Sequence, residues 1–178
     1  MIIFGIDPGS VNCGWGAISW DGQKAQLIEY GVLKAKKMED ELPKRIGYIY
    51  NKIIEKINTC KPDIFCLESV FFSKNPQSLI KLSHARAAAM LAGVNSKLEI
   101  VEYSPNEVKK SVVGKGHASK EQVKFMVQKI INIKETNELF DATDALAVAL
   151  CHAFRGESST KKSNSWKNFI KDNPTRVK

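Results

Sequence analysis

The amino-acid sequence predicts an α/β domain built on a five-stranded mixed sheet flanked by helices. Three short apolar runs, separated by turn residues, precede Lys34 and predict a meander of strands. From Pro43 onward, apolar residues recur every three or four positions, which is typical of amphipathic helices. Two further strand-like runs interrupt these helical segments. The order strand-strand-strand-helix-strand-helix-strand-helices therefore indicates a sheet with helices packed on it.

Each predicted strand is bounded by turn residues or by a helix signal. Asp7-Pro8-Gly9 follows the first strand, and Asp21-Gly22 separates the second from the third. The fourth and fifth strands each precede the start signal of a helix. The predicted strands are 2–6, 14–20, 26–33, 63–70 and 98–103.

Cap residues predict where most of the helices begin. Asn75-Pro76 supplies an N-cap and a first-turn proline for a long helix that ends at about Lys97. Two capping boxes, starting at Ser104 and at Ser119, each open another helix, and Gly114 ends the first of these two. A last helix, from about 138 to 154, is apolar on nearly every face beyond its first turn. The helix after Pro43 carries an apolar stripe of Ile46, Ile49, Ile53 and Ile57.

The composition is that of a single globular domain with its own core. The chain has 178 residues, of which 43% are hydrophobic and 26% charged, a balance that excludes a disordered chain or a coiled coil. No apolar run is long enough for a membrane span, and no basic region precedes an apolar stretch at the start, so we expect no membrane association and a cytoplasmic location. Four well-separated cysteines are expected to be reduced thiols: Cys13, Cys60, Cys66 and Cys151.

Positive charge is concentrated at the end of the chain. The net charge is +8, and residues 156–178 carry six basic and two acidic side chains, hence half of it. We expect residues 1–155 to form the domain and residues 156–178 to form a basic tail. The tail is either flexible or a short docked helix that uses Trp166, Phe169 and Ile170. A basic domain with a basic tail favours a polyanionic partner such as nucleic acid, with an ordinary solvated surface as the alternative.

Four acidic residues occupy positions that folding alone does not favour. Asp7 ends an apolar strand, Glu68 is embedded in the fourth strand, and Asp141 and Asp144 share one face of the last helix. Each has an ordinary alternative, as a turn cap, an edge residue or a helix-dipole partner. If the four converge, their repulsion is resolved by a hard divalent cation such as Mg²⁺ or Mn²⁺. Two such ions can hold the attacking and leaving oxygens of a phosphoryl displacement.

Four blocks of the sequence form a recognisable set. They are Ile3-Phe4-Gly5-Ile6-Asp7-Pro8-Gly9-Ser10 followed by Gly14-Trp15-Gly16, Leu67-Glu68-Ser69-Val70-Phe71-Phe72-Ser73-Lys74-Asn75, Val112-Val113-Gly114-Lys115-Gly116, and Asp141-Ala142-Thr143-Asp144-Ala145-Leu146-Ala147. In this order and spacing they resemble the RuvC family of Holliday-junction resolvases over about residues 1–155. The resemblance implies an RNase H-like fold and a Mg²⁺-dependent homodimer. It also implies symmetric nicking of four-way DNA junctions during recombination and repair, with 5′-phosphate and 3′-hydroxyl ends.

The resemblance assigns roles to particular residues. It implies that Asp7, Glu68, Asp141 and Asp144 are the catalytic and metal-binding acids, with two Mg²⁺ ions expected per site and Mn²⁺ as a substitute. Phe71 matches a family aromatic that stacks on unpaired junction bases. Lys74, in the same block, is expected to bind DNA as well.

Further DNA contacts are expected around a glycine-flanked loop. Lys109 and Lys120 match family positions implicated in activity and in contact with the DNA backbone. Lys115 is a third candidate, because Gly114 and Gly116 permit close approach to phosphate. For Lys110 and Lys115 an ordinary solvated surface remains the alternative. The family also implies a dimer interface along the helix that follows Asn75, and work beside the RuvA–RuvB branch-migration complex.

Three other functions are compatible with parts of the sequence. Asp7-x-Gly9 followed by Gly14 resembles the first phosphate loop of sugar kinases and actin-type ATPases, but those folds need about twice this length. A second alternative is another RNase H-like nuclease that acts on RNA–DNA hybrids or on ribosomal RNA precursors. The third is a non-catalytic junction-binding module, which the presence of all four acids disfavours.

Overall fold

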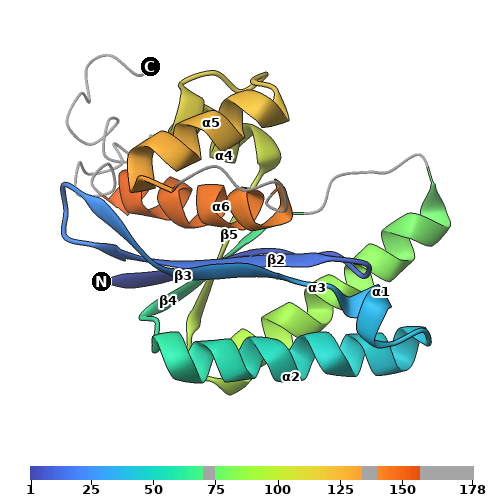
Figure 1. Cartoon of the computed structure of the whole chain (residues 1–178). Helices are drawn as coiled ribbons and strands as arrows, with labels where there is room; N and C mark the ends of the chain where they lie inside the picture. The colour runs from blue at the N-terminus through green and yellow to red at the C-terminus, as the bar shows by residue number, and fades with distance from the viewer. Residues whose placement is uncertain (70–74, 134–139, 157–178) are drawn as a thin grey trace, which may run out of the picture.

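A computed structural model describes residues 1–69, 75–133 and 140–156, and it shows one sheet between two layers of helices (Figure 1). The sheet has the order β3-β2-β1-β4-β5, with β1 at its centre. The first three strands form an antiparallel meander, whereas β4 runs parallel to both β1 and β5. The prediction of a five-stranded mixed sheet is confirmed. The strands are β1 (Ile2–Asp7), β2 (Cys13–Trp20), β3 (Ala25–Leu33), β4 (Ile64–Glu68) and β5 (Glu99–Tyr103).

The predicted cap residues begin the helices as expected. The Asn75 side chain accepts hydrogen bonds from the backbone of Gln77 and Ser78, and both capping boxes are formed, at Ser104 and at Ser119. Gly114 ends α4 in the left-handed conformation, with φ of 81°. A short helix after β3, α1, was not predicted. The helices are α1 (Ala35–Met38), α2 (Leu42–Cys60), α3 (Pro76–Asn95), α4 (Pro105–Val113), α5 (Lys120–Ile131) and α6 (Phe140–Gly156).

The two helical layers divide the core into two parts. Helix α6 lies directly on the sheet, with α4 and α5 above it, whereas α2 and α3 cover the opposite face (Figure 1). Strand residues alternate between the faces. In β1, Ile3 packs toward α6, while Phe4 and Ile6 pack toward α2 and α3. In β4, Cys66 packs toward α6 and Leu67 toward the opposite face.

Glycines allow α6 to lie unusually close to the sheet. A Cβ atom on Gly5 would lie 2.1 Å from the Ala145 carbonyl oxygen, and one on Gly14 would lie 1.9 Å from the Asp141 carbonyl oxygen. Real Cβ atoms do not approach other atoms so closely, so any side chain here would push the helix away. The glycines of β1 and β2 therefore set the height of α6 above the sheet.

Several predicted features lie at or beyond the limits of the described residues. Strand β4 ends at Glu68, before the predicted residue 70, and α6 is described from Phe140 rather than from residue 138. Phe71, Lys74 and the tail beyond Gly156 lie outside the described residues. Within the described segments, no helix is both long enough and apolar enough to cross a membrane. All four cysteines are buried free thiols, as expected.

Candidate active site

Strand alternation places two of the predicted acids on one face of the sheet. Asp7 is the last residue of β1 and Glu68 the last residue of β4, and these two strands are parallel neighbours. The face that takes Ile3 and Cys66 toward α6 also takes Asp7 and Glu68, because side chains two residues apart point the same way. Both carboxylates therefore project toward the helix that carries Asp141 and Asp144.

The start of α6 brings the other two acids to the same place. Gly14 pairs with Asp7 across the β1–β2 ladder, and the Asp141 backbone lies against Gly14. Asp141 is therefore held beside the end of β1, and Asp144 lies one turn further along the same helix face. The structure brings together all four acids that the sequence singled out.

The raised pKa values of Asp7, Glu68 and Asp144 come first from burial and then from neighbouring acids. Burial raises the pKa of Asp7 to about 8, and the nearby charges of Asp144, Glu68 and Asp141 contribute to the rise. Burial also raises the pKa of Glu68, with a further contribution from Asp144. For Asp144, burial raises the pKa against the opposing effect of Lys120. The free site is therefore an electrostatically unfavourable cluster of negative charge.

Two lysines line a small cavity together with two of the acids. The cavity measures about 170 Å³, and Glu68, Lys109, Lys120 and Asp144 are among its lining residues. Lys120 Nζ lies 3.3 Å from Asp144 Oδ2, and the pKa of Lys120 is raised chiefly by Asp144. The Lys120 side chain is 67% exposed and that of Asp144 only 20%, so the ammonium group can turn outward more readily than the carboxylate.

The remaining predicted lysines lie elsewhere. Lys115 is exposed in the loop after α4, and Lys110 is exposed on α4; neither lines the cavity between Glu68 and Asp144. Of the predicted DNA-binding residues that are described, the structure therefore brings Lys109 and Lys120 to the acids, and not Lys115.

The donor set suits a hard divalent cation. Mg²⁺ and Mn²⁺ prefer carboxylate oxygens, and a cation would offset the burial and the repulsion that raise the pKa of Asp7. In the conformation described, no three Asp, Glu, His or Cys side chains of the described residues are grouped as metal ligands. Lys120 instead supplies positive charge beside Asp144.

A buried arginine that the sequence analysis did not single out anchors the loop after Asp7. The Arg45 guanidinium donates hydrogen bonds to the backbone oxygens of Ser10, Glu39 and Asp40. It thereby ties the loop that leaves the active site to the start of α2. No sequence signal marks this contact, because Arg45 and Ser10 are 35 residues apart.

The mixed sheet, with acids at the ends of two parallel central strands and on the helix that crosses them, defines an RNase H-like domain. A family model described as crossover junction endodeoxyribonuclease RuvC matches residues 3–152. The chain belongs to this RuvC family, as its four sequence blocks predict.

Individual relatives are similar in sequence to nearly the whole chain. The chain is 42% identical to the crossover junction endodeoxyribonuclease RuvC of Cytophaga hutchinsonii, over 99% of its own length and 88% of that protein. It is 40% identical to the protein of the same name from Salinibacter ruber, over 99% of both chains. Among solved structures, it resembles T. thermophilus RuvC in complex with a Holliday junction substrate. The TM-score is 0.83 at 33% identity, covering 90% of this chain and 97% of that one.

Proposed function

We propose that the protein resolves four-way (Holliday) DNA junctions by divalent-metal-dependent nicking, during recombination and DNA repair. Membership of the RuvC family and the likeness to a RuvC bound to a junction support this function. The observation that carries it is the convergence of four carboxylates beside Lys109 and Lys120 at one end of the sheet.

In this proposal the acids hold metal and the lysines hold phosphate. Asp7, Glu68, Asp141 and Asp144 would hold Mg²⁺, two ions per site, with Mn²⁺ as a substitute. Bound there, the metal would activate water and stabilise the charge on the phosphate. Lys120 would leave Asp144 for the DNA backbone when the site is loaded, since its side chain is largely exposed. In-line attack with loss of the 3′ oxygen would give 5′-phosphate and 3′-hydroxyl ends.

Contacts with the junction would extend beyond this site. Lys109 and Lys120 would bind the backbone beside the cut. Phe71 would stack on an unpaired base, and Lys74 and Lys115 would add phosphate contacts. The role of Phe71 rests on the family match, and that of Lys74 on its place in the same sequence block. Lys115 is proposed because Gly114 and Gly116 on either side of it permit close approach to phosphate.

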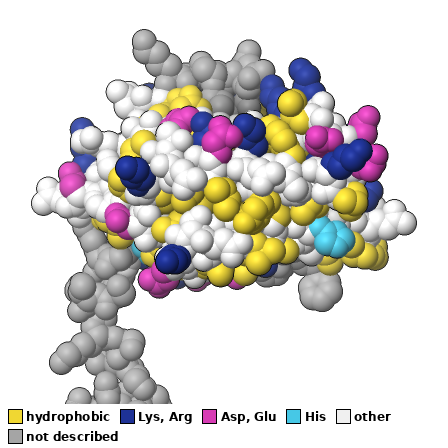
Figure 2. Space-filling view, turned by 90° about the horizontal axis from the view of Figure 1, so that it is seen from below, with side chains coloured by type: hydrophobic (Ala, Val, Ile, Leu, Met, Phe, Trp, Pro, Cys, Tyr) yellow, Lys and Arg dark blue, Asp and Glu magenta, His cyan; other side chains and the backbone are white. Residues whose placement is uncertain are grey.

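The protein would act as a homodimer through α3. The exposed side of α3 carries Ile80, Leu91 and Val94, each more than half exposed. Figure 2 shows hydrophobic side chains gathered on the face formed by α2 and α3. A two-fold dimer would present one acidic site to each of two opposed strands of a junction. We place this dimer in the cytoplasm, beside the RuvA–RuvB branch-migration complex.

A substrate panel tests the proposed function. The full-length protein is incubated with a mobile four-way junction, an RNA–DNA hybrid duplex and ATP, each with and without Mg²⁺. We expect paired nicks at symmetry-related phosphates of the junction, only with metal, and sealable by DNA ligase. Preferential cutting of the hybrid would favour another RNase H-like nuclease, and binding without cutting at any Mg²⁺ concentration would favour a junction-binding module.

A further inference from the structure

We propose that the surface formed by Lys124 and Gln128 of α5 and Phe140 of α6 binds the DNA strand immediately beside the scissile phosphate. We call these three residues the α5 surface. The inference deepens the proposed nuclease function and rests on it. It assigns a contact for the backbone and one base outside the acidic cluster.

Two parallel contacts join α5 to the first turn of α6. Lys120 lies 3.3 Å from Asp144, and Lys124 Nζ lies 4.5 Å from the centre of the Phe140 ring. Lys120 and Lys124 are four residues apart on α5, and Phe140 and Asp144 are four residues apart on α6, so each pair shares a helix face. The second contact is thus one helical turn, about 5.4 Å, from the active-site contact. A strand whose phosphate reaches Lys120 continues past Lys124 and Phe140.

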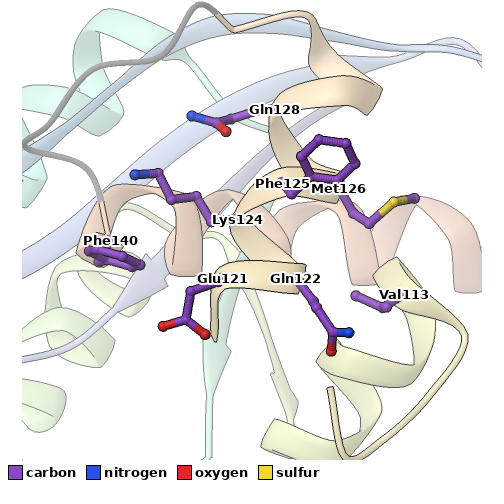
Figure 3. A pocket seen from close by; sticks show the side chains of 8 residues that line it. All are labelled: Val113, Glu121, Gln122, Lys124, Phe125, Met126, Gln128 and Phe140. Atoms are coloured by element: carbon purple, nitrogen blue, oxygen red, sulfur yellow. The ribbon is translucent and has the colours of Figure 1, made fainter. Parts of the chain in front are cut away.

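Phe140 is held in place while its ring remains accessible. The Phe140 carbonyl accepts a hydrogen bond from Thr143 Oγ1 at 2.9 Å, which fixes the residue in the first turn next to Asp141. Its side chain is nevertheless exposed, at 44% for the residue. Figure 3 shows Phe140 and Lys124 on the same side of α5, whereas Gln122 and Val113 lie on the other. An aromatic ring beside an ammonium group is the combination that holds single strands by base stacking and phosphate contact.

Gln128 adds an unused hydrogen-bond donor. Gln128 is only 9% exposed, and its Nε2 has no hydrogen-bond partner among the described residues. It lines the same cavity as Lys124 and Phe140, which has a volume of about 630 Å³. Buried amide groups without a partner are rare in folded proteins. A phosphate or base oxygen of a bound strand would supply the missing acceptor.

The charge around this cavity favours a nucleic acid as the occupant. Lys124 extends the positive charge of Lys120 along one face of α5, and the whole chain has a net charge of +8. One acid, Glu121, also lines the cavity, and its carboxylate bonds to the Ser119 side chain. The α5 surface is also continuous with the active site. A DNA strand at the active site would need this continuity, whereas a docking site for another protein would not.

The inference is tested by asking whether the effect of a protein substitution on junction affinity depends on the modification of a single nucleotide. The nick made by the full-length wild type is mapped first. Affinity without divalent metal is then measured for junctions with one abasic nucleotide, or one uncharged methylphosphonate, at each of the positions flanking the nick. We expect one abasic position to lower the affinity of the wild type about fivefold or more, which is the lower end of base–aromatic stacking. The same abasic junction should bind Phe140→Ala as tightly as the unmodified junction does. Likewise, a methylphosphonate at one position should lower the affinity of the wild type but not that of Lys124→Ala.

Control variants separate the possible outcomes. Ile28→Ala removes another exposed apolar side chain, and Lys24→Ala removes a lysine from the turn at the opposite end of the sheet. Both should keep the full response to every modified junction. If the protein substitutions and the nucleotide modifications change affinity independently at all positions, the inference is overturned. Nicking by the wild type would still uphold the proposed function in that case. A lower melting temperature of Phe140→Ala than of Ile28→Ala, without coupling to DNA, would show that protein packs there and would also overturn it. A wild type that binds no junction would refute the proposed function itself.

Discussion

The carboxyl group of Asp7 lies where burial and three neighbouring acids all oppose its ionisation. Its pKa of about 8 means that, at neutral pH, most metal-free molecules carry a proton on this carboxyl group. A divalent cation would reverse this preference, because it favours the charged carboxylate. The same residues therefore make the metal-free site electrostatically unfavourable and would favour a bound cation.

Replacing the acids should separate cutting from binding. Asp7→Asn, Glu68→Gln and Asp144→Asn keep the shape of each side chain but remove the charge that, in the proposed function, would hold metal. We expect each to abolish nicking and to leave junction affinity near that of the wild type, or slightly tighter. Nicking assays and metal-free binding measurements check this. Glu99→Gln, at the far end of β5, serves as the control and should nick normally. Parallel loss of binding and cutting would instead indicate a folding role.

The raised pKa of Asp7 also predicts a pH dependence of stability. Above about pH 4 the unfolded chain loses this proton, whereas the folded chain keeps it until about pH 8. The folded state then binds more protons, so its stability falls as the pH rises through this range. Without metal, Asp7→Asn should melt above the wild type by a margin that grows from pH 4 to 8. We expect at least about 2–4 °C, the shift that 1 kcal/mol produces at this chain length. A margin that does not change with pH would contradict the burial of this charge.

At the scale of elements, the contact between α6 and the sheet fixes the geometry of the site. Helix α6 carries two of the acids, and glycines of β1 and β2 allow it to lie against the strand that carries Asp7. Arg45 fixes the loop on the other side of Asp7. The acids are thus positioned by backbone packing rather than by hydrogen bonds between their side chains.

Adding one methyl group at this contact should disturb catalysis. In Gly14→Ala the new Cβ would lie 1.9 Å from the Asp141 carbonyl oxygen, so the first turn of α6 must move. We expect a loss of nicking on the order of 10²-fold, as for a displacement of about 1 Å at an active site, together with lower thermal stability. Gly47→Ala is the matched control, because no atom lies within 4 Å of its added Cβ. It should nick normally and gain up to about 1 kcal/mol in helix stability.

At the scale of the whole molecule, a cluster of acids lies within a positively charged chain. The chain has a net charge of +8 while its four acids gather at one end of the sheet. Lys109 and Lys120, beside the acids, would bring the DNA backbone to the same place as a bound cation. Junction affinity should depend steeply on salt, because each lysine–phosphate contact releases counterions.

Single lysine variants should report how many of these contacts exist. Lys109→Ala and Lys120→Ala should each lower the slope of log affinity against log salt by about one. Binding titrations without divalent metal over a range of salt concentrations measure this slope. Lys24→Ala, distant from the acids, should leave the slope unchanged. The same slope in all four proteins would place the cavity between α4 and α6 away from the DNA.

Much of the architecture could be predicted because its signals are local. The N-caps at Asn75, Ser104 and Ser119 act on backbone groups two or three residues away, so the sequence determined where α3, α4 and α5 begin. Strand runs and helical periodicity are local in the same way. The acids were recognisable because ionised groups in apolar segments need a partner or a metal.

The tertiary structure alone decided how the parts meet. Lys120 and Asp144 are 24 residues apart, and Arg45 and Ser10 are 35 apart, so no local pattern links them. The sequence by itself determined the five strands, the starts of α3, α4 and α5 and the four acids, because short-range hydrogen bonds and burial govern them. The strand order and the close packing of α6 against the sheet decided on which side of the sheet the acids meet. They also decided that Lys120 is the lysine that pairs with Asp144. Those arise only when distant segments pack together.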